Sequence, residues 1–588
     1  MTPSLMPAMT PSTTSTASAT HTDGERDNDT QRRLQRKISQ ALDEGHDADI
    51  PSSQGFVLDE EGELKRQQSI VSRRGLSNAT KSNGNRDVEK AQVSGEGTPS
   101  MINQGDGDGD DDTDPNVVWW DGPDDPENPY NWPKWRKFLN CGLISAMTFI
   151  SPLASSAFAP GVPQVMTEFK SSSLEIAAFV VSVYVLGFAA GPMLFAPLSE
   201  IYGRVIIYHI CNVGFVAFSV ACALAPSLNS LIGFRFLAGL FGAAPIANGG
   251  GTIADMVVQE HRGAAMAVFS IGPLLGPIVG PIAGGFLTEA EGWRWAFWLL
   301  AIAGGVLLIC MLLFLKESYA PVILARKTTR LQKQTGNDML RSKLDAGLSP
   351  QDYFKRGIIR PFKMLAFSPI VVIMALYMAV AYGYLYLLFT SMTEIFEQYY
   401  GFTTSTVGLA FIGLGVGSLA GVILFSLTSD RYVRRKAAEV DAAAEAAEGT
   451  KGGMKPEYRL PALPVAAILI PAGLFMYGWT AEKQVHWIAP IIGTALVGVG
   501  NIIIFMSIQM YLVDAFSIYA ASAIASNTVV RSIAGAVLPI AGLKMYARLG
   551  VGWGNSLLGF IALLLAPAAI LLIKYGEGLR NKFPIKNL

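Results

Sequence analysis

The chain has 588 residues, of which 50% are hydrophobic and only 16% are charged, and its mean hydropathy is +0.33. Soluble domains usually carry about 25% charged residues, so this composition excludes an ordinary soluble protein. The net charge is −1, which gives no reason to expect a nucleic-acid partner.

Residues 1–117 form a polar segment that is rich in Ser, Thr, Gly and Asp. Such a segment cannot bury a core, so we expect a disordered tail. Its run GDGDGDDDTD (105–114) lacks the sixth-position glycine and the twelfth-position glutamate of an EF-hand. Ser39, Ser69 and Ser77 each follow an arginine by three residues. A basophilic kinase is therefore a candidate partner of the tail, and an ordinary basic linker is the alternative.

Long apolar runs begin after residue 137 and continue almost to the C-terminus. A helix needs about 20 apolar residues to cross the hydrocarbon core of a bilayer, and about twelve runs have this length. We expect helices, because only helices and closed barrels satisfy the backbone in lipid. The predicted spans are 138–160, 175–196, 205–225, 230–254, 264–287, 294–315, 367–391, 404–427, 462–481, 487–511, 520–544 and 554–574.

The charges of the connections predict the orientation. Lys and Arg gather in the connections on the side of the N-terminus, above all between Lys316 and Lys363. Basic connections stay in the cytosol, so we expect both termini there, and we expect the plasma membrane as the location. The predicted organisation is a cytosolic tail (1–117), a six-helix bundle (118–315), a cytosolic linker (316–366), a second six-helix bundle (367–575) and a cytosolic C-terminal tail (576–588).

Two pairs of short segments indicate that the halves repeat. PLSEIYGR (197–204) ends the second predicted span and LTSDRY (427–432) ends the eighth. PIAGG (281–285) lies in the fifth span and PIAGL (539–543) lies in the eleventh. Two similar halves in parallel orientation place a substrate site between them near the middle of the membrane. Chance similarity between apolar helices is the alternative.

The fifth predicted span contains residues that usually break helices. Four glycines recur every four residues on one helix face, where a neighbouring backbone can approach closely: Gly272, Gly276, Gly280 and Gly284. Three prolines lie on the adjacent face, where each removes a backbone hydrogen bond and permits a kink: Pro273, Pro277 and Pro281. We expect this helix to act as a hinge at a domain boundary, with a static packing motif as the alternative.

Four segments of the chain share motifs with one known family. They are GPLLGPIVGPIAGG (272–285), GPMLFAPLSEIYGR (191–204), RFLAGLFGAAPIANGGGTIADM (235–256) and WDGPDDPENPYNWPKWRK (120–137). As a set, they resemble motifs of the major facilitator superfamily (MFS), and within it the fungal drug:proton antiporters with twelve spans. The resemblance covers about residues 118–580. It implies an all-α MFS fold with twelve transmembrane helices in two pseudo-symmetric six-helix bundles.

The resemblance also implies roles for individual residues. Arg235 belongs to the fourth-helix motif that is tied to proton coupling. Arg204 would pair with Asp255 and clamp the cytosolic side while the transporter faces outward; snorkelling of charges at the interface is the alternative. The loop between helices two and three departs from the family signature at Ala196, Glu200, Ile201 and Val205. Glu200 and Arg204 are therefore left to carry its charges.

Several polar side chains fall inside predicted spans, where hydrocarbon makes them costly. Arg235 and Arg531 each need a cavity or a partner, and Asn527 shares a helix face with Arg531. The further candidates for the substrate cavity are Asn248, Tyr377, Tyr382, Tyr384, Asn501 and Gln509. Together with Tyr386, the tyrosines suit amphipathic guests, and an aromatic packing stripe is the alternative. Two buried arginines without a mid-span acid favour neutral or anionic substrates over polyamines.

Other chemistries find no support in the sequence. GLGVGS (413–418) lacks the spacing of a phosphate loop, and there is no Walker lysine motif. We therefore expect that transport is not driven by ATP, that the protein is not an enzyme, and that it binds no cofactor and no metal. The four cysteines lie in apolar runs and are interpreted as small buried side chains: Cys141, Cys211, Cys222 and Cys310.

The prediction that follows is a proton-coupled exporter that moves small organic molecules outward by alternating access. Its substrate would be a xenobiotic or an endogenous metabolite such as an organic acid. We expect a monomer in the lipid bilayer, with a small molecule and protons as its partners. The proton carrier is left open between Asp255 and the surroundings of Arg235. The alternatives are uptake of a nutrient by proton symport and a membrane sensor that transports nothing.

Overall fold

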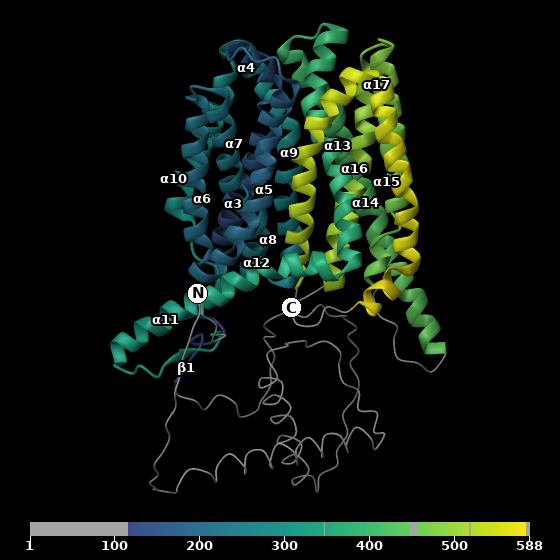
Figure 1. The fold of residues 1–588 in the computed structure, drawn as a ribbon. Coiled ribbons are helices and arrows are strands. Elements are labelled where there is room, and N and C mark those ends of the chain that lie inside the picture. Colours follow the sequence, from purple (N-terminus) through teal and green to yellow (C-terminus); the bar gives the residue numbers. More distant parts are fainter. Residues whose placement is uncertain (1–115, 346, 348, 447–454, 517–518, 584–588) are drawn as a thin grey trace, which may run out of the picture. The chain divides into compact units, whose positions relative to one another are not determined.

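The computed structural model describes residues 116–345, 347, 349–446, 455–516 and 519–583. The tail predicted to be disordered, its acidic run and its three candidate phosphorylation sites lie outside the described residues, except for the last two residues of the tail. The described chain is almost entirely helical (Figure 1).

The first half of the described chain contains six membrane spans. Five of them are single long helices and the fourth is broken into α7 and α8, where Pro245 opens the second piece without a backbone N–H to donate. The spans are formed by α3 (Lys134–Ser156), α5 (Leu174–Tyr202), α6 (Arg204–Ala223), α7 (Leu228–Gly242) with α8 (Ala244–Met256), α9 (Gln259–Glu291) and α10 (Trp293–Phe314). The short α4 (Val162–Glu168) and the 3-10 turn η2 (Ala159–Gly161) follow α3.

The second half repeats this plan with α13 (Pro369–Tyr400), α14 (Thr404–Ala446), α15 (Leu463–Glu482), α16 (Ile488–Phe516) and α17 (Ala520–Lys582). Eleven helices of the described chain are long and apolar enough to cross a membrane. The longest, α17, is two helices joined at Gly550, whose φ of 77° and ψ of 170° are not helical. The twelve predicted spans are therefore confirmed.

One helix is much longer than its predicted span. The eighth span was expected to end at residue 427, but α14 continues as a helix to Ala446. The extra turns are rich in Ala, Glu, Lys and Arg, which have high helix propensity in water. Glu439 also pairs with Arg435 at 2.9 Å and with Lys436 at 2.6 Å, at spacings that stabilise an exposed helix.

The segment between the two halves contains two further helices, α11 (Ala320–Thr335) and α12 (Pro350–Phe367). Both lie at the same end of the helical bundles (Figure 1), which we call the linker end; the opposite end, which carries α4, is the far end. Two strands that were not expected from the sequence form a short parallel pair, β1 (Val117–Val118) and β2 (Arg341–Ser342). This pair attaches the residues before α3 to the linker.

Residues 116–132, which we call the N-terminal clasp, also bind α11 through charged groups. The carboxylate of Asp125 accepts the backbone N–H groups of Asp121 at 2.9 Å and of Glu127 at 2.8 Å. Lys327 Nζ lies 2.7 Å from Asp121 Oδ1 and 3.2 Å from Asp125 Oδ2. Arg330 pairs with Glu127 at 3.0 Å. The clasp therefore depends on charges of both signs.

We expect the N-terminal clasp to stay closed between about pH 5 and pH 9. Burial raises the pKa of Asp125, but the two N–H groups and Lys327 outweigh it, so the net shift is downward. Burial lowers the pKa of Lys327, but Asp121 and Asp125 outweigh it, so the net shift is upward. The contribution of Asp125 is lost only as the pH falls through its lowered pKa, and that of Lys327 only as the pH rises through its raised pKa.

Limited proteolysis of the linker across this pH range measures the closure of the clasp. The wild type should be cut at a constant low rate between the two limits, whereas Asp125→Asn should be cut faster at every pH in the range. A wild-type rate that climbs between pH 5 and pH 9 would contradict this account.

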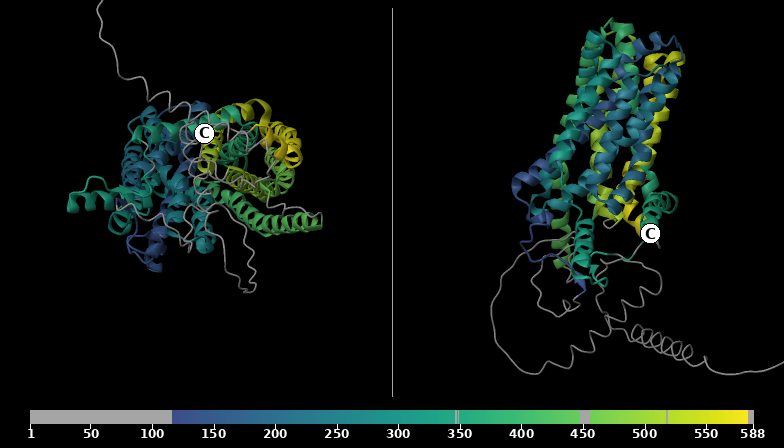
Figure 2. Two further views of the ribbon diagram at one scale, coloured as in Figure 1. Left: turned by 90° about the horizontal axis from the view of Figure 1, so that it is seen from below. Right: turned by 90° about the vertical axis from the view of Figure 1, so that its left-hand side faces the viewer.

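The two halves form two bundles that lie side by side when viewed along the helices (Figure 2). They meet where α5 packs on α17 and where α9 packs on α14. Glycines make the second contact close, since a Cβ on Gly408 would overlap the backbone of Pro281. Ser182 Oγ also donates to the carbonyl of Ala536 at 2.9 Å across this boundary. A substrate that passes between the bundles must separate these surfaces.

Polar contacts join the bundles at the far end. Glu289 at the end of α9 accepts the N–H of Ser405 at the start of α14 at 2.7 Å. Glu175 of α5 forms an ion pair with Lys544 of α17. Because both contacts link one bundle to the other, they hold the far end closed in this conformation.

Candidate functional site

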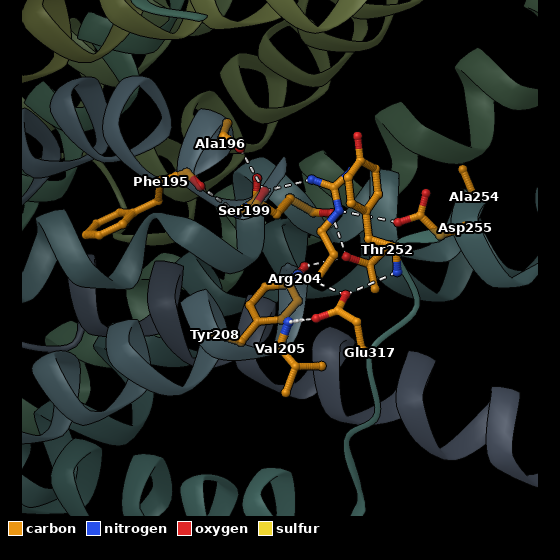
Figure 3. Close-up of polar contacts among 12 residues, drawn as sticks. Phe195, Ala196, Ser199, Arg204, Val205, Tyr208, Thr252, Ala254, Asp255 and Glu317 are labelled. Carbon is orange, nitrogen blue, oxygen red and sulfur yellow. Dashed lines mark hydrogen bonds and ion pairs between the residues drawn. The ribbon is translucent and has the colours of Figure 1, made fainter. Parts of the chain in front are cut away.

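A polar cluster occupies the turn between α5 and α6 at the linker end (Figure 3). Gly203 makes this turn with a φ of 103°, a conformation that favours glycine, and α6 begins at the next residue. The carboxylate of Glu317, just after α10, accepts the N–H groups of Arg204 at 3.0 Å, Val205 at 3.2 Å and Tyr319 at 3.1 Å. It thus satisfies two of the N–H groups that a helix start leaves unpaired and faces the positive end of the α6 dipole.

The side chain of Arg204 lies at the centre of this cluster. Its Nε is 3.3 Å from Asp255 Oδ2, and its Nη1 donates to Ser199 Oγ at 2.7 Å. Its Cζ lies 4.7 Å from the ring centroid of Tyr319, within cation–π range. Burial raises the pKa of Tyr319 well above its usual value, so the ring stays neutral. The structure therefore brings together the predicted partners Arg204 and Asp255.

Glu200, at the end of α5, lies close enough to Arg204 and Arg360 to interact with both electrostatically. Its side chain is exposed, and within the described part of the chain it makes no ion pair. Glu317 takes the structural role instead, although it lies 113 positions after Arg204 in the sequence. The sequence did contain an indication of this role for Glu317. The residue lies just after the sixth span and therefore at the same membrane face as the turn between α5 and α6.

The second bundle carries a similar set of charges at the linker end. Arg459, which ends the 3-10 turn η3 (Pro456–Arg459) ahead of α15, pairs with Asp514 near the end of α16 at 3.1 Å. Lys455 pairs with Glu577 near the end of α17 at 2.9 Å. The same helix ends carry the cluster in the first bundle. This repeat could not be expected from the sequence, since the residues are not in similar local motifs.

Asn248 belongs to the cluster at the linker end and not to a cavity with the other candidates. Its Nδ2 lies 3.5 Å from the carbonyl of Phe195 on α5, and its own carbonyl accepts from Thr252 Oγ1 at 2.9 Å. Thr252 Oγ1 lies 2.7 Å from the hydroxyl of Tyr208. These contacts join α5, α6 and α8 next to Asp255, so Asn248 positions the helix that carries the acid.

Arg235 on α7 is buried at the middle of the first bundle, with 1% of its surface exposed. Its Nη2 donates to the carbonyls of Ser155 at 3.3 Å and Val181 at 3.1 Å. Its Cζ lies within 5.6 Å of three aromatic ring centroids, those of Phe158, Tyr184 and Phe297. Among the described residues no carboxylate pairs with it, so carbonyl dipoles and ring faces alone balance its charge.

A chain of contacts links Arg235 to the other bundle. Ser155, whose carbonyl binds Arg235, also accepts from the hydroxyl of Tyr386 on α13 at 3.0 Å. The ring of Tyr386 lies 5.0 Å from that of Tyr382, and the Cζ of Arg531 on α17 lies 4.9 Å from the Tyr382 centroid. The two buried arginines are thus connected through two tyrosines across the bundle boundary.

Three other candidates lie on the opposite side of α13 from the contacts that link Arg235 to Arg531. They are Tyr377 and Tyr384 of α13 and Asn501 of α16. The two tyrosines line an apolar pocket inside the second bundle, and the Tyr384 hydroxyl donates to the carbonyl of Leu558 at 2.8 Å. Asn501 Nδ2 donates to the carbonyl of Ala381 at 2.6 Å. These three side chains therefore hold the second bundle together and do not meet Tyr382 or Arg531.

The glycine face of α9 packs on α3 within its own bundle. A Cβ added to any of Gly272, Gly276, Gly280 and Gly284 would overlap the α3 backbone. The helix itself runs unbroken through its three prolines. Pro281 has no N–H to give to the carbonyl of Pro277, and Ser156 Oγ of α3 donates to that carbonyl instead, at 3.1 Å. Gly285 and Gly408, not the four-residue repeat, form the contact between bundles.

We expect Gly284→Ala to reduce the yield of folded protein severely, because the added Cβ would collide with the carbonyl of Ala157. Overpacking of this kind costs about 1–3 kcal/mol or more. Gly305→Ala on α10 is the matched control, since a Cβ there would meet nothing within 4 Å. Detergent-solubilised protein that elutes as a single species measures the yield. Equal yields for the two variants would contradict the close packing of α9 on α3.

No group of three or more His, Cys, Asp or Glu side chains in the described residues could hold a metal ion. The described site consists of a charged cluster at the linker end of each bundle and one buried chain of contacts between arginines and tyrosines at mid-height.

Comparison with known proteins identifies the family. The family model for the Major Facilitator Superfamily matches residues 144–539. This chain belongs to the major facilitator superfamily.

Three fungal MFS proteins are similar to it over most of their length. MFS-type transporter tndD of Aspergillus flavipes is 57% identical, covering 80% of this chain and 86% of tndD. MFS-type transporter penM of Penicillium rubens is 55% identical, covering 80% and 90%. Efflux pump radE of Floropilus chiversii is 52% identical, covering 80% and 87%.

Solved structures support the same fold. A crystal structure of a D-xylose-proton symporter superposes with a TM-score of 0.56 at 15% identity and covers 74% of this chain and 97% of the symporter. This MFS protein is therefore a multi-pass membrane protein and a secondary transporter of small molecules. It is not an enzyme.

Proposed function

We propose that this protein exports a small organic molecule, an endogenous secondary metabolite in the first place, in exchange for protons. The observation that carries the proposal is the chain of buried polar contacts from Arg235 through Tyr386 and Tyr382 to Arg531, which crosses the boundary between the bundles. Polar groups at that depth mark a substrate or ion pathway. The name of the relative radE, an efflux pump, supports the outward direction.

Alternating access supplies the cycle. In the present conformation contacts hold both ends: Glu289 with Ser405 and Glu175 with Lys544 at the far end, and Arg204 with Asp255 at the linker end. The substrate would enter from the linker end once that last pair opens. We place the linker end and both termini in the cytosol, because Lys and Arg gather there, and we place the protein in the plasma membrane. Closure of the linker end would then expose the site to the outside.

Asp255 is our candidate for the proton carrier. It is the acid that holds Arg204, and it sits at the end of α8 at the linker end. Protonation would release Arg204, whose remaining contacts with Ser199 and Tyr319 keep it in the cluster. Arg235 would respond to substrate binding through its contacts across the bundle boundary. The hinge would lie where α9 meets α14 and not on the glycine face of α9.

Metabolite retention in cells with and without the gene tests the export proposal. Cells that lack the gene should retain at least one metabolite that wild-type cells release, and an alkaline medium should reduce release from wild-type cells because the inward proton gradient is smaller. Nutrient uptake would instead show as depletion inside the cells that lack the gene. Identical profiles in both strains at both pH values would overturn the proposal.

A further inference from the structure

The strongest unassigned feature of the molecule is a group of buried polar atoms without partners beside Arg531. Arg531 has 8% of its surface exposed and Asn527 has 1%. Arg531 Nε and both amide atoms of Asn527 are buried and unpartnered, as is Gln509 Oε1 on α16. Among the described residues Arg531 has neither an ion pair nor a hydrogen bond. Burying such groups is costly unless something pairs with them.

These residues lie at matching depths on two neighbouring helices. Phe505 and Arg531 lie the same number of residues away from the connection between α16 and α17. Gln509 and Asn527 are also equally far along the chain from this connection. Because each residue advances a helix by the same rise, Gln509 and Asn527 share one level. Arg531 lies one turn farther into the membrane, where its Cζ is 5.2 Å from the Phe505 centroid and 4.9 Å from that of Tyr382.

Unpartnered buried polar atoms occur elsewhere in the described chain, Arg235 Nε among them, but here several of them lie on two neighbouring helices around one guanidinium. Arg235, the other buried arginine, donates to two carbonyls, and Asn501 on the same helix as Gln509 donates to the carbonyl of Ala381. The protein thus satisfies at least one donor of each of these two side chains internally. At Arg531 it leaves a cation, an amide and a second acceptor open, and it holds the guanidinium between two ring faces that fix its plane.

We propose that Arg531, Asn527 and Gln509 bind the acidic group of an organic anion whose remainder is a flat conjugated ring system. A guanidinium offers parallel N–H donors that match a carboxylate or an enolate. The Asn527 amide adds a donor, and Gln509 Oε1 accepts from a hydroxyl on the substrate. The faces of Tyr382 and Phe505 then contact the conjugated part. This inference rests on the proposed export function and names its substrate class.

The charge of the surroundings favours an anion over a cation. Arg235 lies at the other end of the contact chain through Tyr382 and Tyr386, and no described carboxylate pairs with either arginine. A cationic guest would meet two like charges in a medium that screens them poorly. An anion would neutralise Arg531 and remove the cost of its burial.

Binding of a matched acid and ester tests the inference. We would measure binding of 7-methoxycoumarin-3-carboxylic acid and of its methyl ester to the purified full-length protein by fluorescence anisotropy. The acid should bind at least about tenfold more tightly than the ester, as expected for charge-assisted hydrogen bonds. Arg531→Gln should reduce acid binding to the level of the ester and leave ester binding unchanged, and Arg531→Lys should be intermediate.

The controls separate recognition from folding. Arg548→Gln removes an exposed arginine from the same helix and should bind like the wild type. If Arg531→Gln does not fold, Asn527→Ala carries the test, with an expected loss of several-fold for the acid alone. Equal binding of acid and ester by the wild type, binding of neither, or a preference that survives Arg531→Gln would overturn the inference. Metabolite retention that depends on the gene would leave the export function standing in that case.

Discussion

Replacing Arg235 by methionine should abolish transport while leaving the fold as stable as the wild type or more so. Arg235 is a buried cation without a carboxylate partner among the described residues, and an apolar side chain of similar length removes the cost of burying that charge. The same change removes the donor to Ser155, whose hydroxyl holds Tyr386 of the other bundle. Transport should therefore fall to the background level.

Thermal unfolding of Arg235→Met in detergent, at one fixed scan rate, measures the first effect and flux in cells measures the second. Arg294→Met is the control, because Arg294 is partly exposed and paired with Glu168 at the far end, and such pairs contribute about 1 kcal/mol or less. A large drop in unfolding temperature, with flux falling only as the amount of folded protein falls, would show that Arg235 is structural.

Replacing Glu317 by alanine should reduce transport about tenfold, whereas Glu200→Ala should change it less than twofold. Glu317 accepts three backbone N–H groups, two of them at the start of α6, and loss of a helix cap alone costs about 1 kcal/mol. Without the cap the turn that positions Arg204 against Asp255 loosens. Glu200 is exposed and supports no helix start.

Glu317→Gln separates the two contributions of this side chain. Its amide oxygen can still accept an N–H group, but it no longer carries charge at the α6 N-terminus, so we expect flux between those of the wild type and Glu317→Ala. Flux per molecule of folded protein is the quantity to compare. A larger loss for Glu200→Ala than for Glu317→Ala would return the role to the residue that the sequence motif favoured.

The positions of the glycines and tyrosines explain why some candidates were placed well and others were not. The pairing of Arg204 with Asp255 could be expected because Arg204 begins one span and Asp255 lies at the end of the next, on the same face of the membrane. The even spacing of glycines in α9 correctly indicated a close backbone contact, but the partner is α3 and not the other bundle. The tyrosines of α13 divide between two faces, and only Tyr382 and Tyr386 reach the boundary.

Hydropathy and spacing act within a single helix, so the sequence by itself determined the twelve spans, their division into two halves and the face that each residue shares with its neighbours. Which helix covers which face was decided by the tertiary structure alone. Glu317 and Arg204, or Tyr386 and Ser155, are far apart in the chain, and they meet because many helix contacts are satisfied together. No local pattern records that arrangement, since it depends on the shapes of all the surfaces that pack at once.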